Sequence, residues 1–127
     1  MRFYSTKNKS NFVSLKEAVL KGLPDDNGLF MPEYIPVLPD SFFNDISNLT
    51  FKEISLIVTE AFIGDSIPKK DLESIINATI SFPAPLIKLD EGINILELFH
   101  GPSLAFKDFG ARFMAQLMSY LNRGEEE

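Results

Sequence analysis

A single lysine near the end of the chain could perform nucleophilic chemistry. We predict a helix from Ser103 to about Asn122. Projected at about 100° per residue, Lys107 falls between Met114 and Met118, inside the apolar arc of that helix. Burial of a lysine among apolar groups favours its neutral amine, the form that attacks an aldehyde. The alternative is that the flexible stem carries the ammonium out to solvent from the first helical turn.

Three residues just before this lysine are further candidates for binding ligands. His100, the sole histidine, could meet a phosphate or a carboxylate, or could be a turn residue bonded to backbone. Ser103 could touch a ligand or could cap the helix that follows it. Phe106 could pack beside a flat ring or belong to the apolar core. Asp108 and Arg112 stand four residues apart, so we expect an exposed helix pair there.

Capping patterns and prolines indicate the elements that would position these residues. Ser14 with Glu17, and Thr50 with Glu53, form capping boxes ahead of apolar residues at helical spacing. A turn at residues 90–92 would join two extended runs as a hairpin or as neighbouring strands. In order, we expect a strand at 2–5, a polar loop at 6–11, a helix at 14–21, a turn-rich connection with at most one short strand at 24–39, a helix from Thr50 to Gly64, a helix at 68–80, extended runs at 86–90 and 93–99, and a final helix stopped by Gly124.

The Pro-Ala-Pro sequence at residues 83–85 separates a mostly helical part from the two extended runs. We therefore predict a boundary near residue 81. Residues 1–80 would form an α-rich N-terminal domain, and residues 81–127 would contribute the first strands and helix of an α/β domain. The fold class expected for the whole is α/β.

Composition narrows the classes of function. The 127 residues carry a net charge of −6 and show no basic cluster, which argues against a nucleic-acid surface. The chain has no cysteine, so thiolate metal sites and disulfides are excluded, and we expect no metal site. Its apolar runs are shorter than the roughly 20 residues of a membrane span. A cytoplasmic location without membrane or nucleic-acid partners is the expectation.

Two blocks of sequence resemble one enzyme family. Residues 97–113 read ELFHGPSLAFKDFGARF, which looks like the cofactor-lysine segment of threonine synthases. In the same order, residues 4–6 (YST), 17–20 (EAVL) and 27–30 (NGLF) resemble the start of that family. The family usually has Thr in place of Ser103, Thr-Arg in place of Thr6-Lys7, and Asp-Gly-Gly in place of residues 26–28. Residues 40–82 carry no motif that resembles the family.

The resemblance implies a pyridoxal-phosphate enzyme of fold-type II. Such an enzyme converts O-phospho-L-homoserine and water to L-threonine and phosphate. Lys107 would bind the cofactor covalently and, once released by the substrate amine, would transfer protons. Phe106 would lie beside the cofactor, and His100 and Ser103 are the candidates for contact with substrate.

Part of such a site is missing from these residues. A cofactor phosphate is normally held by backbone N–H groups of a glycine-rich loop, whereas the seven glycines here are scattered. In the family this loop would follow residue 127, so we expect an N-terminal fragment that is inactive alone and retains no cofactor. Its main partner would be the remainder of its own catalytic domain, and uncovered apolar surface would favour self-association. The alternative is a self-sufficient helical interaction module without catalysis.

Overall fold

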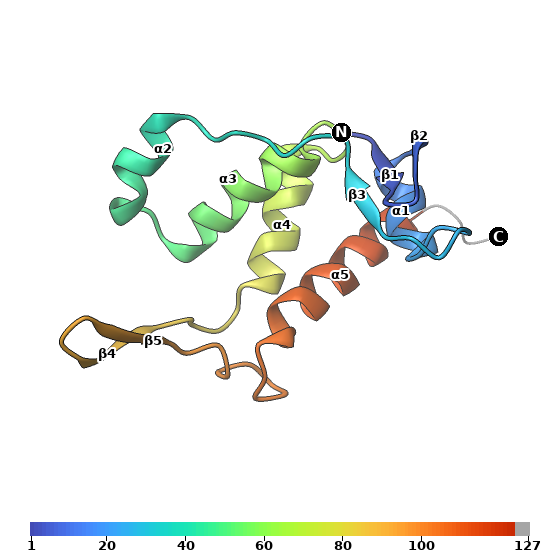
Figure 1. The fold of residues 1–127 in the computed structure, drawn as a ribbon. Helices are drawn as coiled ribbons and strands as arrows, with labels where there is room; N and C mark the ends of the chain where they lie inside the picture. Colours follow the sequence, from blue (N-terminus) through green and yellow to red (C-terminus); the bar gives the residue numbers. More distant parts are fainter. Residues whose placement is uncertain (124–127) are drawn as a thin grey trace.

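Three helices form the centre of this computed structural model, which describes residues 1–123. Helices α3 and α4 pack side by side, and α5 runs along α4 (Figure 1). A small sheet and α1 lie at one end of these helices, and a two-stranded hairpin projects at the other (Figure 1). The elements are β1 Phe3–Ser5, β2 Asn8–Val13, α1 Leu15–Lys21, β3 Phe30–Pro32, α2 Asp40–Asp45, the 3-10 helix η1 Ile46–Asn48, α3 Phe51–Ile63, α4 Lys69–Thr79, β4 Leu86–Asp90, β5 Ile93–Leu96 and α5 Lys107–Leu121.

The N-terminal sheet has the order β2-β1-β3 with antiparallel pairs throughout. The strand expected at the N-terminus is confirmed, whereas the polar loop expected at residues 6–11 is wrong because β2 occupies most of it. All of β2 before Val13 is exposed, so its side chains show no apolar alternation that could have revealed the strand. The strand is held by backbone pairing and by an edge-to-face contact between Phe12 and Tyr4, with ring centroids 6.2 Å apart.

The helix starts predicted from capping patterns are confirmed. The Ser14 side chain accepts a hydrogen bond from the backbone N–H of Glu17 at the start of α1. At the start of α3, Thr50 and Glu53 form the reciprocal capping box. These bonds satisfy N–H groups that lack a partner within their own helix. Helix α2 was not predicted from the sequence. It is a short segment anchored by the buried Phe42.

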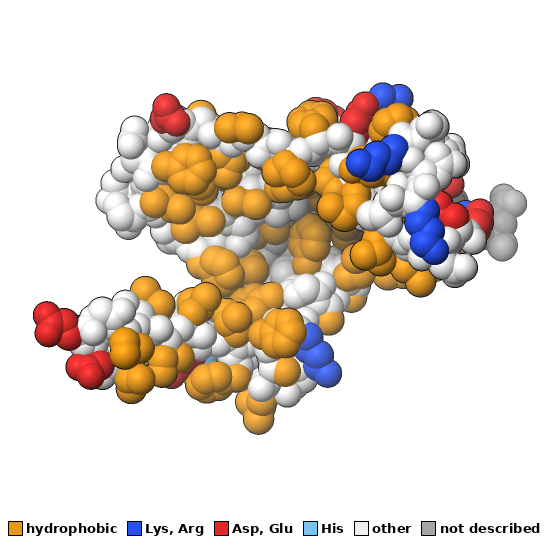
Figure 2. Space-filling model, viewed as in Figure 1, with side chains coloured by type: hydrophobic (Ala, Val, Ile, Leu, Met, Phe, Trp, Pro, Cys, Tyr) orange, Lys and Arg blue, Asp and Glu red, His pale blue; other side chains and the backbone are white. Residues whose placement is uncertain are grey.

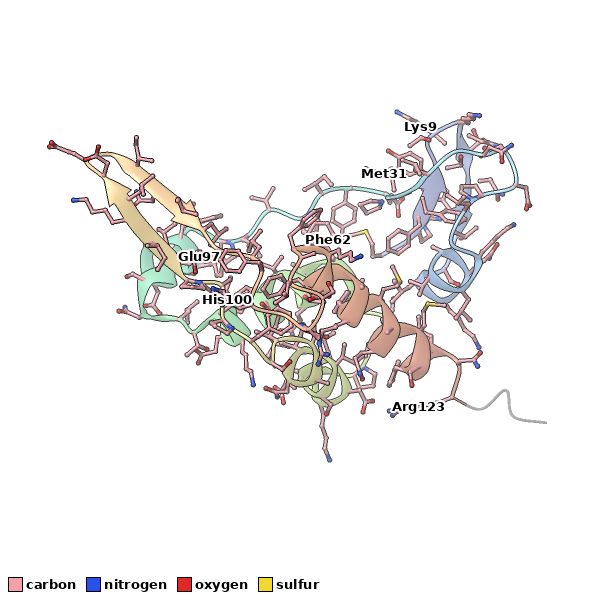
Figure 3. All side chains as sticks on the ribbon, turned by 90° about the horizontal axis from the view of Figure 1, so that it is seen from below. Lys9, Met31, Phe62, Glu97, His100 and Arg123 are labelled. Atoms are coloured by element: carbon pink, nitrogen blue, oxygen red, sulfur yellow. The ribbon has the colours of Figure 1, made fainter. Side chains whose placement is uncertain are left out.

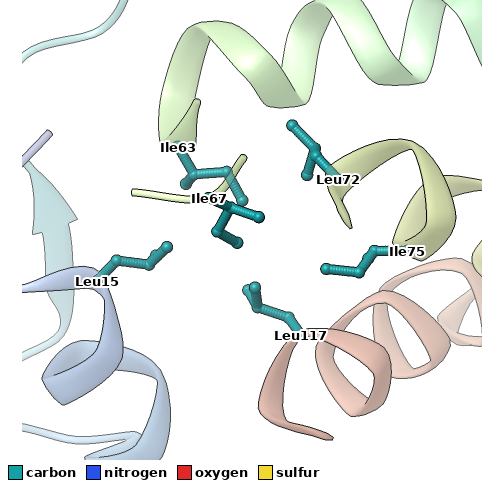
Figure 4. Close-up of a cluster of buried hydrophobic side chains, with 6 residues drawn as sticks. All are labelled: Leu15, Ile63, Ile67, Leu72, Ile75 and Leu117. Atoms are coloured by element: carbon teal, nitrogen blue, oxygen red, sulfur yellow. The ribbon is translucent and has the colours of Figure 1, made fainter. Parts of the chain in front are cut away.

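The apolar core joins the first and last helices of the chain. Six buried side chains converge between α1, α3, α4 and α5, as Figure 4 shows. They are Leu15, Ile63, Ile67, Leu72, Ile75 and Leu117. The core therefore includes a residue of α5, on the far side of the boundary expected near residue 81. That division into two domains stays a prediction.

The hairpin β4–β5 carries apolar side chains that the described residues leave uncovered. Its antiparallel strands pair Leu86 with Leu96 across a turn at Gly92, which has a φ of 73°. The hairpin expected from the sequence is confirmed, although β5 ends at Leu96 and not at Phe99. Both strands are exposed along their whole length, and orange side chains line this arm in Figure 2. The uncovered apolar surface is thus present, while self-association stays a prediction.

Within residues 1–123, none of the helices has the length and apolar character needed to cross a membrane.

Candidate active site

The candidate lysine is the first residue of α5, which begins later than expected. The sequence predicted a helix start at Ser103, but residues 101–106 form an irregular turn and the helix starts at Lys107. Leu104 adopts a φ of 55°, a left-handed conformation that interrupts any helix running through it. The prediction that Ser103 caps this helix is therefore wrong. The predicted stop at Gly124 lies outside the described residues.

Lys107 is exposed in this structure. Its ammonium makes no hydrogen bond or ion pair with any residue in the range 1–123. The apolar arc that holds it is also at the surface, since Met114 and Met118 are both exposed. The face of α5 that packs inward is the one carrying Asp108 and Leu117. In this chain the lysine reaches solvent, as the alternative reading of the sequence expected.

Two apolar residues that precede the lysine, Leu104 and Phe106, are exposed and do not belong to the core. Phe106 is 72% exposed and Leu104 is 75% exposed, so core packing does not explain Phe106. An open pocket of about 470 Å³ lies elsewhere, between the start of α3 and residues 80–85, and candidate site residues do not line it. The turn and the first residue of α5 therefore present an amine between exposed apolar groups.

His100 is paired with a carboxylate. Its Nε2 lies 2.7 Å from Oε2 of Glu97, and its ring stacks on Phe99 with centroids 4.7 Å apart (Figure 3). The sequence had offered a backbone bond as the alternative to ligand binding, but the observed partner is a side chain three residues earlier. The pairing leaves the second ring nitrogen, Nδ1, for a ligand.

Asp108 is the unexpected member of the site. It is only 7% exposed, and its carboxylate accepts hydrogen bonds from both the backbone N–H (2.8 Å) and the hydroxyl of Ser103. The bond from the Ser103 hydroxyl, despite partial desolvation, holds the pKa of the Asp108 carboxyl below its usual value. The exposed pair expected between Asp108 and Arg112 is therefore wrong. Helical spacing could not predict the bond from Ser103 to Asp108, because Ser103 lies in the turn before the helix.

Arg112 ties α5 to the end of α4. Its guanidinium donates to the backbone oxygen of Ala78 at 2.9 Å and to the Ser81 hydroxyl at 3.1 Å. The last carbonyl groups of a helix lack partners within it and carry partial negative charge, so a cation there is favourable. This contact fixes α5, and with it Lys107, relative to α4.

These residues satisfy part of what pyridoxal phosphate needs. An accessible amine at a helix start, beside exposed apolar side chains, suits covalent attachment of the aldehyde and packing of the ring. The residues that would hold the phosphate are not evident among 1–123. A cluster of three or more potential metal-binding side chains is likewise not found in that range.

Comparisons with known proteins give the family. The family profile described as "Threonine synthase N terminus" matches residues 2–80. The threonine synthase of Escherichia coli (strain K12) is 41% identical over 95% of this chain and 28% of its own length. That of Haemophilus influenzae is 44% identical over 94% of the chain and 28% of its own length.

Solved structures agree with the sequence matches. The crystal structure of Escherichia coli threonine synthase aligns with a TM-score of 0.91 at 41% identity, over 95% of this chain and 28% of that one. A threonine synthase from Brucella melitensis, solved with bound PLP, aligns with a TM-score of 0.91 at 32% identity, over the whole of this chain and 28% of that one. The mixed helix-and-strand fold is thus that of one portion of a larger enzyme structure.

The chain belongs to the threonine synthase family, which confirms the resemblance seen in the two sequence blocks. It spans about 28% of the length of these curated relatives.

Proposed function

We propose that the full-length protein containing this chain is a pyridoxal-phosphate-dependent threonine synthase. It converts O-phospho-L-homoserine and water to L-threonine and phosphate in the cytoplasm. The observation that carries the proposal is the position of Lys107, exposed at the start of α5, in a chain that belongs to this family. The remainder of the catalytic domain is its expected partner, and it would supply the phosphate-binding groups.

Each candidate residue has a distinct part in the proposal. When bound, pyridoxal phosphate supplies an electron sink for carbanion chemistry at the substrate amino acid. The Lys107 amine holds the cofactor aldehyde and, once free, accepts and returns protons at the substrate carbons. Phe106 offers an apolar surface to the cofactor ring. His100 contacts the substrate through Nδ1, and Ser103, whose hydroxyl hydrogen is donated to Asp108, accepts a hydrogen bond from the substrate through its hydroxyl oxygen.

The alternative, a self-sufficient interaction module, makes a different prediction about cofactor binding. The uncovered hairpin is compatible with either reading, because both an interaction module and one portion of a domain present apolar surface. Covalent attachment of the cofactor to Lys107 is expected only for the enzyme.

The test is chemical mapping of the cofactor lysine. The full-length gene product is purified with pyridoxal phosphate, reduced with borohydride and digested, and the labelled peptide is identified by mass spectrometry. We expect the label on Lys107, with phosphate release from O-phosphohomoserine. Lys107→Arg should abolish the label and should lower the activity by at least about 10³-fold, since the nucleophile and the proton-transfer group are lost together.

The matched control is Lys70→Arg, an exposed lysine in the first turn of α4. It should keep both the label and the activity. The 127-residue chain alone should retain no cofactor after gel filtration. Label confined to other lysines of the full-length protein would sink the enzyme proposal and favour the interaction module.

A further inference from the structure

Asp108 places an ionised group where burial is costly. Removing a carboxylate from water is unfavourable unless hydrogen bonds replace its hydration. Both replacing bonds come from one residue, Ser103, five positions earlier and across the turn. Since a hydrogen bond to a charged group is stronger than a neutral one, these two bonds close the turn firmly.

The same carboxylate also packs against the beginning of the turn. Gly101 is buried, and a Cβ atom at that position would clash with the Asp108 carboxylate and would come within 2.8 Å of the Phe82 ring. Asp108 thus fills the space between Gly101 and Ser103. The left-handed Leu104 then completes a turn whose backbone is determined at several points.

Lys107 depends on that backbone for its direction. It follows the turn directly and precedes Asp108, so the two side chains leave α5 about 100° apart. Asp108 points into the structure, and Lys107 points out. Because the lysine side chain has no hydrogen-bonding partner in residues 1–123, its starting direction is set by the turn and the first turn of α5.

We propose that Asp108 is a positioning residue for Lys107, fixing through its two bonds to Ser103 the turn from which the lysine projects. This inference rests on the proposed function, because positioning matters only if Lys107 binds the cofactor. Asp108 itself touches neither cofactor nor substrate in this proposal. Its effect is to keep the amine in place when the cofactor is captured.

The experiment uses the full-length gene product loaded with pyridoxal phosphate. Asp108→Asn replaces one accepting oxygen by an NH₂ group that cannot accept from Ser103. We expect amide hydrogen exchange in residues 101–106 to rise about tenfold, and the cofactor dissociation constant to rise by a similar factor. The induced circular dichroism of the bound cofactor, which reports how its ring is held, should weaken per molecule bound.

Variants of the partner residue keep the test decisive if Asp108→Asn fails to fold. Ser103→Ala removes the hydroxyl bond and leaves the backbone bond, so its effects should be in the same direction and smaller. Ser103→Thr retains the hydroxyl, so its hydrogen exchange, cofactor affinity and induced circular dichroism should equal those of the wild-type protein. Glu91→Gln, which removes an exposed carboxylate at the hairpin turn, is the control and should change none of these quantities.

Two outcomes would overturn the proposal. If Asp108→Asn or Ser103→Ala lowers the melting temperature but leaves cofactor affinity and induced dichroism unchanged, Asp108 is only structural. If borohydride mapping of the wild-type protein finds no label on Lys107, the proposed function and the positioning role both fall. The first result leaves the proposed function standing, so the two failures are distinguishable.

Discussion

Leu104 shows how much of the candidate site depends on the backbone of single residues. Its left-handed φ of 55° costs about 1–3 kcal/mol for a residue other than glycine. Such a conformation persists only where neighbouring contacts hold it, and here the bonds between Ser103 and Asp108 enclose it. The turn before Lys107 is therefore stabilised by side chains that lie on both sides of the strained residue.

Two glycines near the lysine should respond oppositely to alanine. Gly101→Ala should destabilise the chain by about 1–3 kcal/mol, because the added methyl group meets Asp108 and Phe82. Gly110→Ala, inside α5 where a Cβ meets no neighbour within 4 Å in the described residues, should stabilise it by about 0.4–1 kcal/mol. Urea denaturation of both variants measures the difference. Equal changes in the free energy of unfolding for the two variants would show that Gly101 has room for a methyl group.

Helix α5 is the element that connects the candidate site to the rest of the chain. Its buried side, including Leu117 at 3% exposure, closes the core formed by α1, α3 and α4. Its first turn carries Lys107, and Arg112 binds the end of α4. The lysine is thus mounted on an element that the N-terminal helices hold in place.

Truncation of Leu117 tests that connection. Leu117→Ala should lower the free energy of unfolding by about 2–5 kcal/mol, because it opens a cavity in the shared core. Met118→Ala, the exposed neighbour on the same helix, should change it by about 0.5 kcal/mol or less. Urea denaturation followed by far-ultraviolet circular dichroism measures the free energy of unfolding of both variants. If Leu117→Ala leaves the stability of α1, α3 and α4 unchanged, α5 unfolds separately from those helices.

Elements with local signals were predictable from the sequence. Ser14 and Thr50 mark helix starts through contacts three residues away, and Gly92 marks a turn between apolar runs. Strand β2 was missed because its pairing with β1 is its main support. The start of α5 was misplaced because Ser103 bonds to a side chain beyond the helix start, which is a three-dimensional arrangement. For the same reason, Asp108 gave no sign of burial.

At the scale of the whole molecule, several carboxylates depend on remaining ionised. Hydrogen bonds lower the carboxyl pKa of Asp26 through the Ser5 hydroxyl, of Glu33 through Arg2, and of Glu53 through the Thr50 hydroxyl. The bonds of Asp26 and Glu33 join residues far apart in the sequence, whereas those of Glu53 and Asp108 are local to the start of a helix. Each carboxylate binds fewer protons when folded than when unfolded near its ordinary pKa, so the folded state is favoured above that range.

Acid should therefore destabilise the folded chain. The contribution of these carboxylates is complete above about pH 5 and is lost as the pH falls through their lowered pKa values, below about pH 4. The midpoint of urea denaturation, measured at several values between about pH 6 and pH 2, should decrease over the same pH range. The double variant Asp26→Asn and Asp108→Asn should be less stable at neutral pH and should show a flatter decline. An identical slope in that variant would contradict the assignment.

The core between α1, α3, α4 and α5 brings together segments that are synthesised at different times. Synthesis proceeds from the N-terminus, and early segments can begin to fold while later ones are still being added. Leu15, Ile67 and Leu72 emerge long before Leu117, which covers them in the finished core. This core is therefore complete only after α5 has been synthesised. Completion of this core and delivery of the candidate lysine are one event in biosynthesis.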